Sequence, residues 1–251
     1  MMFSQKTIWL IGASEGIGEA VAEQLAQQGA TLILSSRNGE MLTALAARLS
    51  GSGHLVVPLD VTNMASIENA WQNILSKQKM PDTMIYNAGY YEPIGARRYN
   101  LDQIEQIIDV NLRGALRVLS LVLPGFIARD SGHVVLVGSV AGYSGLPKSL
   151  GYGSSKAGVI HLAESLKLDL VRTAIKVQLV SPGFVKTRLT DKNNFAMPFL
   201  MLVDAAARRI VTGMASKRFE IHFPRRFSLI LKLLRLLPYP LYFRLIRRIS
   251  G

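Results

Sequence analysis

Short apolar runs alternate with longer amphipathic segments along most of the chain. The apolar runs are rich in Val, Ile and Leu and show little alternation, which is typical of strands buried on both faces of a parallel sheet. Six such runs are predicted as strands, at residues 7–11, 31–35, 54–59, 83–87, 133–138 and 176–180.

The segments between these runs place apolar residues three or four positions apart, which predicts helices. They cover residues 18–28, 40–49, 65–77, 101–119, 153–171 and 203–214. Strands that alternate with helices form a doubly wound α/β sheet with helices on both faces. We therefore predict a single Rossmann-type domain over residues 1–222, with its ligand at the carboxyl ends of the strands.

Length and composition agree with one α/β domain. The chain has 251 residues, of which 49% are hydrophobic, and this share excludes a disordered chain. It contains no cysteine, which excludes disulfides and a cysteine nucleophile, and we expect a cytoplasmic protein without a metal site. The apolar run at residues 8–11 is too short for a signal peptide, and no uncharged run approaches the length of a membrane span.

Positive charge is concentrated at the C-terminus. The formal net charge is +12, and residues 217–251 hold nine Lys or Arg and one Glu. Residues 223–251 therefore form a basic and apolar tail, and its function is considered separately from that of residues 1–222.

Two amphipathic helices are predicted in this tail, at residues 226–237 and 241–249. In the first, the polar positions share one narrow stripe: Arg225, Ser228, Lys232 and Arg235. Leu, Ile and Phe opposite basic residues are typical of a membrane-interface helix, so we expect residues 225–249 to bind the inner face of a membrane. A subunit interface or a cover over the substrate pocket is the alternative. Nucleic acid is not an expected partner, because the tail is too apolar.

A glycine-rich turn follows the first predicted strand. Gly12, Gly16 and Gly18 have the spacing G-x-x-x-G-x-G and lead into the first helix. Such glycines permit a tight turn, close approach of the backbone to a pyrophosphate and close helix packing, and the helix N-terminus favours an anion. This turn therefore predicts a dinucleotide site, which also includes Ser14, Glu15 and Ile17.

The end of the second predicted strand selects between two cofactors. An acid there would bind a ribose 2′-hydroxyl, whereas an arginine suits a 2′-phosphate. The chain has Arg37 and no acid at this point, which favours NADP(H) over NAD(H). Glu15 argues the other way if its charge points toward the 2′-phosphate, and Arg37 as a solvated loop residue is the alternative.

Tyr152 and Lys156 lie four residues apart in a predicted helix and so share one helix face. A nearby ammonium stabilises a tyrosinate, so Lys156 is expected to lower the pKa of Tyr152, whose phenol can then act as general acid or base. Ser139 closes the fifth predicted strand at the ligand-binding edge, where its hydroxyl is placed to hold a substrate oxygen.

Together these residues resemble the short-chain dehydrogenase/reductase family of the single-domain type. The resemblance extends over residues 5–222 and rests on Gly12-x-x-x-Gly16-x-Gly18, Asn87-Ala88-Gly89, Asn111, Ser139, Tyr152-x-x-x-Lys156 and Pro182-Gly183. It implies hydride transfer between a nicotinamide cofactor and a carbonyl or alcohol group, in a homodimer or homotetramer.

The resemblance also implies residue roles. Tyr152 would donate and accept the proton, Lys156 would bind the nicotinamide ribose, and Ser139 would polarise the carbonyl. Asn111 would hold a water that relays protons to Lys156. The other matches would contact the cofactor: Asp60 and Val61 at the adenine, Asn87, Ala88 and Gly89 along the cleft, and Pro182, Gly183, Val185 and Thr187 at the nicotinamide.

The segment after Pro182-Gly183 is expected to cover the substrate. Residues 195–202 are strongly apolar and include two methionines, which suits an adaptable hydrophobic lid. Ordinary packing beneath the next helix is the alternative for this segment. Further candidates for the pocket lining are Tyr90, Tyr91, Ala141, Tyr143 and Leu146. Because no carboxylate clamp is evident, we predict an apolar, lipid-like ketone or alcohol as the substrate.

The leading interpretation is an NADP(H)-dependent carbonyl reductase or alcohol dehydrogenase that is peripheral to a membrane. One alternative is a soluble 3-oxoacyl-thioester reductase whose tail serves oligomerisation. Another is a non-catalytic nucleotide-sensing or scaffold protein. In a purely structural role, Asn111 would be a helix-kink residue and Ser139 a strand-end cap.

Overall fold

The computed structural model describes residues 2–77, 80–192 and 196–250. In this part of the chain, parallel strands form one sheet in the order β3-β2-β1-β4-β5-β6-β7. The strands are β1 (Thr7–Ile11), β2 (Thr31–Ser35), β3 (Leu55–Val56), β4 (Thr83–Tyr86), β5 (Gly132–Val137), β6 (Ile175–Pro182) and β7 (Glu220–Phe223). The predicted doubly wound parallel sheet is confirmed.

Two strands differ from the prediction by more than shifts of one or two residues at their ends. Only Leu55 and Val56 pair with β2 at one edge of the sheet, where a longer strand was predicted. The edge strand β7 was not predicted, because its four residues alternate between buried and partly exposed positions and precede the basic tail. The prediction of six strands is therefore wrong by one, and the last strand ends at Phe223.

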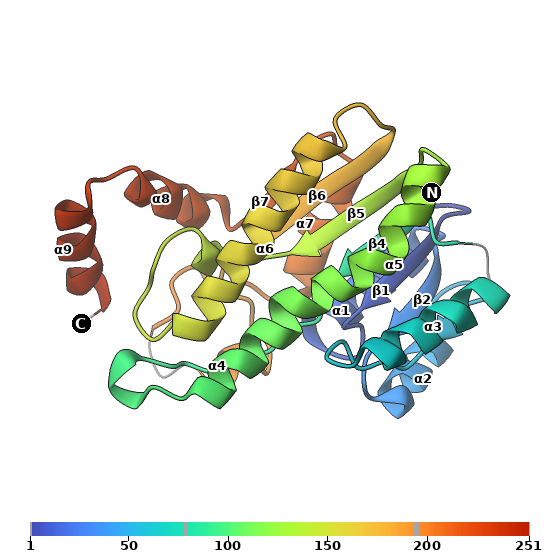
Figure 1. Ribbon diagram of the computed structural model, residues 1–251, viewed down its shortest axis with the longest axis horizontal. Helices are drawn as coiled ribbons and strands as arrows, with labels where there is room; N and C mark the ends of the chain where they lie inside the picture. The colour runs from blue at the N-terminus through green and yellow to red at the C-terminus, as the bar shows by residue number, and fades with distance from the viewer. Residues whose placement is uncertain (1, 78–79, 193–195, 251) are drawn as a thin grey trace.

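Helices cover both faces of the sheet (Figure 1). Their bounds are α1 (Gly16–Gln27), α2 (Gly39–Arg48), α3 (Met64–Lys77), α4 (Leu101–Ile108), α5 (Gly114–Ala128), α6 (Leu150–Asp169), α7 (Val203–Met214), α8 (Arg225–Arg235) and α9 (Tyr239–Ser250). Helices α3, α5 and α6 share one buried apolar cluster with the sheet, and α1, α2 and α7 share the other. This two-sided burial explains the nearly continuous apolar runs of the strands.

The register of the sheet brings several predicted site residues to one edge. Ile11 lies beside Ser35 of β2 and Tyr86 of β4, and Tyr86 lies beside Leu136 of β5. The turns that follow β1, β4, β5 and β6 therefore meet at the carboxyl edge, where ligands bind in open α/β sheets.

One continuous helix runs from Leu101 to Ala128, nine residues beyond the predicted end. It is made of α4, a π-helical turn at Asp109–Arg113 and α5. Among the described helices it alone has the length and apolar composition that a membrane span requires. In the structure its buried residues, among them Val122 and Phe126, pack against the sheet, and this packing continues the helix past Pro124.

Both predicted tail helices are present, as α8 and α9, and they lie at the end of the molecule remote from α2 and α3 (Figure 1). The middle of the polar stripe of α8, at Ser228 and Lys232, faces the rest of the protein, whereas Arg225 and Arg235 at its ends are exposed. Ser228 is buried and its hydroxyl lies 2.6 Å from Nδ1 of His222, and Lys232 forms an ion pair with Glu220. In α9, Tyr242 is buried and donates a hydrogen bond of 2.7 Å to the carbonyl oxygen of Gly145.

Candidate active site

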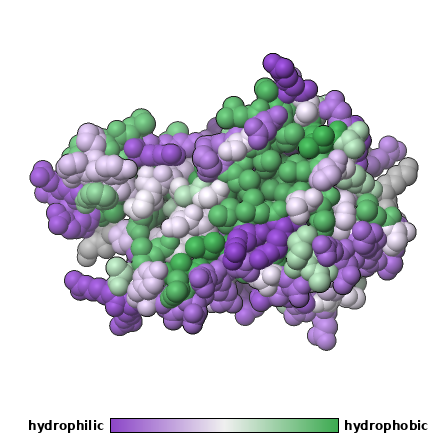
Figure 2. All heavy atoms as spheres, in the orientation of Figure 1, coloured by the Kyte–Doolittle hydropathy of each residue, from purple (hydrophilic) through white to green (hydrophobic). Residues whose placement is uncertain are grey.

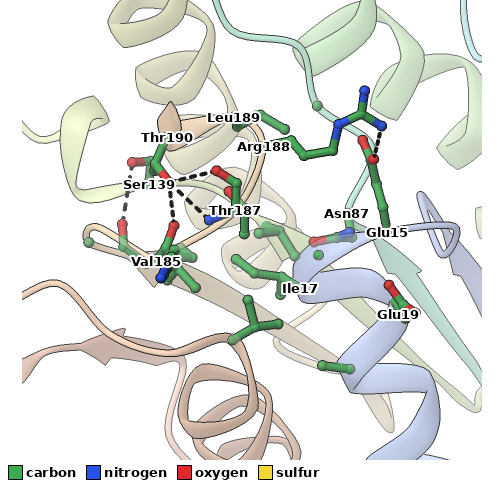
Figure 3. A pocket seen from close by; sticks show the side chains of 18 of the residues that line it. Glu15, Ile17, Glu19, Asn87, Ser139, Val185, Thr187, Arg188, Leu189 and Thr190 are labelled. Atoms are coloured by element: carbon green, nitrogen blue, oxygen red, sulfur yellow. Dashed lines mark hydrogen bonds and ion pairs between the residues drawn. The ribbon is translucent and has the colours of Figure 1, made fainter. Parts of the chain in front are cut away.

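A cleft of about 640 Å³ opens at the carboxyl edge of the sheet, between the start of α1 and the segment that follows β6 (Figure 3). The structure brings most of the predicted site residues to its walls: Glu15, Gly16, Ile17, Asn87, Gly89, Ser139, Tyr152, Lys156, Pro182, Gly183, Val185 and Thr187. Its volume lies within the range of small-molecule and cofactor sites.

The glycine turn has the geometry of a nucleotide cradle. Gly12 and Gly16 have φ angles of +86° and +59°, which favour glycine. A Cβ on Gly12 would lie 2.6 Å from the backbone nitrogen of Ala88, and a Cβ on Gly18 would lie 1.9 Å from the carbonyl oxygen of Gly12. Asn87 fixes this turn, because its Nδ2 donates a 2.7 Å hydrogen bond to the same oxygen of Gly12.

An ion pair crosses the mouth of this cleft. Nη1 of Arg188 lies 2.9 Å from Oε2 of Glu15, and the two side chains reach toward each other from the segment after β6 and from the start of α1 (Figure 3). The charge of Glu15 is therefore paired at the surface of the protein. Sequence reasoning did not assign Arg188 to the cleft, since its partner is 173 residues away and no local pattern links them.

Ser139 stands directly after β5 with a buried side chain. Its hydroxyl donates to the carbonyl oxygen of Pro182 at 3.3 Å and accepts a hydrogen bond from the backbone nitrogen of Ala141 at 3.1 Å. The residue thus caps the short 3₁₀ turn at Val140–Gly142 and also lines the cleft. These structural contacts fix the hydroxyl in a position that can serve a bound oxygen.

Tyr152 and Lys156 both line the cleft from α6. Burial raises the pKa of Tyr152 to about 12, although a hydrogen bond with Ser139 acts in the opposite direction. The expected lowering of the Tyr152 pKa by Lys156 is therefore wrong for the protein without ligand. The spacing of four residues places both side chains on one face, but it does not report how strongly the protein desolvates the phenol.

Lys156 is buried, and its ammonium donates a 2.8 Å hydrogen bond to the carbonyl oxygen of Val137. Burial lowers the pKa of Lys156 to about 8. Its Nζ lies 5.8 Å from the centre of the Tyr152 ring. The ammonium is therefore close to the Tyr152 ring, while its hydrogen bond goes to Val137.

Asn111 is fully buried in the π-helical turn. Its Oδ1 accepts from the backbone nitrogen of Tyr90 at 2.7 Å, and its Nδ2 donates to the carbonyl oxygen of Tyr90 and to Oγ of Ser155. Oδ1 of Asn111 and Nζ of Lys156 both lie within 4 Å of the position that a Cβ on Gly89 would occupy. Asn111 therefore ties the strand-end segment at Tyr90 to α6, close to Lys156.

Other predicted cofactor residues lie outside the cleft walls: Gly12, Ser14, Gly18, Arg37, Asp60, Val61 and Ala88. Arg37 is exposed two residues after the end of β2. Burial raises the pKa of Asp60, but hydrogen bonds from Thr62 and the charges of Arg37 and Arg117 outweigh it and hold the pKa low. Val61 is buried, and its carbonyl oxygen accepts a hydrogen bond from Arg117.

The predicted substrate residues separate into two groups. Tyr91 packs edge-on against the Tyr152 ring, with centroids 4.9 Å apart, and Tyr90 bonds to Asn111 through its backbone. Tyr143 and Leu146 instead lie under the tail, in a small cavity that Leu231 and Tyr242 also line. Ala141 lies next to Ser139, to whose hydroxyl its backbone donates.

The groups around the cleft suit a nicotinamide dinucleotide. Within residues 2–77, 80–192 and 196–250 there is no group of three or more His, Asp or Glu that could hold a metal ion. At one end of the cleft lies the glycine turn, beside a helix N-terminus that favours phosphate. Gly16 lines the cleft, and a Cβ on Gly12 or Gly18 would strike the backbone of the turn or of the residues packed on it. At the other end lie a hydroxyl, a phenol and an ammonium, the groups needed at a ribose and a carbonyl.

Comparisons with known proteins agree with this geometry. Residues 6–197 match the family described as short chain dehydrogenase. An uncharacterized oxidoreductase of Myxococcus xanthus is 35% identical over 248 residues, 98% of both chains. An uncharacterized oxidoreductase of Staphylococcus epidermidis is 35% identical over 76% of this chain and 83% of its own.

Solved structures show the same architecture. A short-chain dehydrogenase from Sphingobium yanoikuyae in complex with NADPH is 29% identical, with a TM-score of 0.80 over 90% of this chain and 91% of its own. A Burkholderia phymatum short chain dehydrogenase/reductase in complex with NAD is 22% identical, with a TM-score of 0.85 over 93% and 94% of the two chains. This chain therefore belongs to the short-chain dehydrogenase/reductase family and is an NAD(P)-dependent oxidoreductase.

Proposed function

We propose that the protein transfers a hydride between NADP(H) and a carbonyl or alcohol group of an apolar, lipid-like substrate. The catalytic residues in this proposal are Asn111, Ser139, Tyr152 and Lys156. One observation carries it: Ser139, Tyr152 and Lys156 line the same cleft as Gly16 of the glycine turn, so a bound dinucleotide would reach from that turn to these groups.

The nicotinamide, when bound, supplies or accepts the hydride. Tyr152 has a pKa of about 12, so its phenol is protonated at neutral pH and can give its proton to a carbonyl oxygen. The hydroxyl of Ser139 holds that oxygen beside the phenol. Lys156 binds the ribose hydroxyls and returns a proton toward Tyr152, and Asn111 holds the water that supplies Lys156.

Two features favour NADP(H). Arg37 is exposed at the end of β2, where no acid is present to bind a 2′-hydroxyl. Glu15, which counted against NADP(H), is paired with Arg188 and presents no uncompensated charge to a 2′-phosphate. The Sphingobium relative was solved with NADPH, which supports the same choice.

An apolar substrate is favoured by aromatic and aliphatic side chains that lie next to residues of the cleft wall in space or along the chain. Tyr91 packs on Tyr152, and the segment after β6 ends in exposed Phe199, Leu200 and Leu202. These side chains offer aromatic and aliphatic contacts for a hydrocarbon group attached to the reacting carbon.

For assembly and location, we propose a cytoplasmic homodimer or homotetramer whose residues 225–249 attach to the inner face of a membrane. Figure 2 shows a broad hydrophobic area over α5 and α6. Exposed apolar side chains on these helices include Leu116, Ile127 and Leu168, which suit a subunit interface.

Titration of the purified protein with NADPH and NADH, followed by nicotinamide fluorescence, tests the cofactor. Preferential binding of NADPH, lost in Arg37→Ala, is the expected result. Equal or stronger binding of NADH contradicts the preference, and binding of neither contradicts the proposed function. A screen of apolar ketones with Tyr152→Phe as control then tests the chemistry: the variant should bind NADPH normally and fail to turn over.

A further inference from the structure

Helix α8 turns part of its apolar surface outward, while Phe227 and Leu231 pack against the core. The middle of its polar stripe faces the rest of the protein, where Ser228 is buried and Lys232 forms an ion pair with Glu220. The opposite face carries four exposed apolar side chains: Leu229, Ile230, Leu233 and Leu236. Leu233 and Leu236 are 64% and 78% exposed, although a soluble helix normally buries such residues. Exposed apolar residues that gather on one face mark an interaction site.

The segment just before α7 extends this apolar surface. The ring of Phe199 lies 6.1 Å from that of Phe227 in α8, and Phe227 stacks on Phe184 with centroids 5.5 Å apart. Exposed side chains follow Phe199 along the segment. We call the combined surface the apolar platform: Phe199, Leu200, Leu202, Leu229, Ile230, Leu233 and Leu236.

Around the α8 part of the platform the charge has one sign, whereas exposed Asp204 follows Leu202 in the other part. The chain contains no acid after Glu220, and that carboxylate is occupied by Lys232, Tyr143 and Ser181. Arg225 and Arg226 are exposed in the first turn of α8, where positive charge opposes the helix dipole and does not stabilise the helix. Further exposed arginines follow: Arg235, Arg244, Arg247 and Arg248. Apolar side chains among arginines match a surface of anionic head groups above hydrocarbon.

The platform is also joined to the cleft. The backbone nitrogen of Met201 donates to the carbonyl oxygen of Phe184 at 3.0 Å, and that of Lys186 donates to Met201 at 2.9 Å. Val185, between these two positions, lines the cleft and pairs with Met201 in a parallel bridge. A partner that holds the platform therefore also lies next to the wall of the cleft.

We infer that the apolar platform docks into the head-group region of an anionic lipid bilayer, and that the substrate enters the cleft from that lipid. The second part rests on the proposed function, because only an apolar substrate would be held in the bilayer. The docking refines the membrane attachment proposed above by naming the surface and the lipid, and it can be tested without a substrate.

The test is co-sedimentation of the full chain with vesicles of phosphatidylcholine, with and without one quarter phosphatidylglycerol. Leu233→Ser/Leu236→Ser removes two exposed leucines, and Arg225→Gln/Arg226→Gln removes two charges. The matched controls are Leu75→Ser/Val171→Ser, which removes exposed apolar groups elsewhere, and Arg208→Gln/Arg209→Gln on α7. NADPH binding on the same samples shows that each variant is folded.

We expect the wild type to bind the anionic vesicles and to bind pure phosphatidylcholine more weakly. The leucine variant should lose on the order of 50-fold in affinity and the arginine variant about 30-fold, while both controls bind as the wild type does. Equal loss in test and control variants, or no vesicle binding by the wild type, overturns the inference. A different result would assign the platform to a subunit interface instead. In that case the wild type would not bind vesicles, and light scattering would show that the serine substitutions turn a dimer into a monomer. Failure of the wild type to bind NADPH refutes the proposed function whatever the vesicles show.

Discussion

Replacing Lys156 by methionine should stabilise the ligand-free protein while it removes activity. The ammonium of Lys156 is buried, and the structure gives it one hydrogen-bond acceptor, the carbonyl oxygen of Val137. Burial lowers the pKa of Lys156 from 10.5 to about 8. A pKa unit corresponds to about 1.4 kcal/mol, so a charged Lys156 costs the folded state about 3 kcal/mol below pH 8.

Methionine has a similar length and carries no charge, so Lys156→Met removes this cost. The substitution also removes the hydrogen bond to Val137, which offsets about 1–2 kcal/mol of the gain. The free energy of unfolding should therefore rise by about 1–2 kcal/mol at pH 7. For a chain of this size the melting temperature should increase by roughly 3–6 °C. Lys167→Met, on the exposed side of the same helix, is the matched control and should change little.

The pH dependence separates this explanation from a simple gain in packing. As pH rises above 8, folded Lys156 releases its proton, while the unfolded chain keeps it until about pH 10.5. The wild type therefore gains stability across this range, and its deficit relative to Lys156→Met should shrink. Thermal unfolding by circular dichroism at pH 7, 9 and 10.5 measures the difference. A variant that melts below the wild type at pH 7, or a difference that ignores pH, refutes the reasoning.

Three further outcomes are expected. Gly18→Ala should abolish NADPH binding in a fluorescence titration, because its Cβ would lie 1.9 Å from a backbone oxygen of the cradle. Glu220→Gln should lower the free energy of unfolding by about 1–3 kcal/mol, measured in urea at pH 7. Burial raises the pKa of Glu220, but its hydrogen bonds, above all the one from Lys232, hold this pKa below its usual value. The wild type therefore loses stability in acid, and the difference between the two proteins should shrink there. Arg188→Ala should change the free energy of unfolding by less than about 1 kcal/mol, because its ion pair with Glu15 is exposed. The same substitution leaves Glu15 unpaired at the cleft and should therefore speed NADPH dissociation in stopped-flow experiments.

The fold could be predicted because its strands are buried on both faces. The predicted runs at residues 7–11 and 31–35 coincide with β1 and β2, and the glycine turn between β1 and α1 has the positive φ angles that its sequence requires. Strand β7 could not be found in this way. It is an edge strand of four residues with alternating burial, and only its pairing with β6 makes it a strand.

The candidate site could be predicted as a set of residues, but its electrostatics could not. The sheet edge brings Ser139 to Tyr152, as the strand pattern indicated. The pKa of Tyr152 depends on how much protein surrounds the phenol, and Lys156 is directed to a carbonyl oxygen of β5 that lies 19 residues away in the sequence. Spacing within one helix carries neither piece of information.

The tail shows most clearly where a pattern stops being informative. An amphipathic sequence predicts that α8 has an apolar face and a polar stripe, and the default is that the apolar face packs on the protein. Here Lys232 forms an ion pair with Glu220 on β7, the strand that was not predicted, and Ser228 lies against His222. The middle of the polar stripe therefore packs inward. Phe227 and Leu231 pack against the core, and Leu229, Ile230, Leu233 and Leu236 face outward. An anionic lipid bilayer can contact the outward leucines through its hydrocarbon and the exposed arginines through its head groups. For this reason we favour anionic lipid over a neutral protein surface.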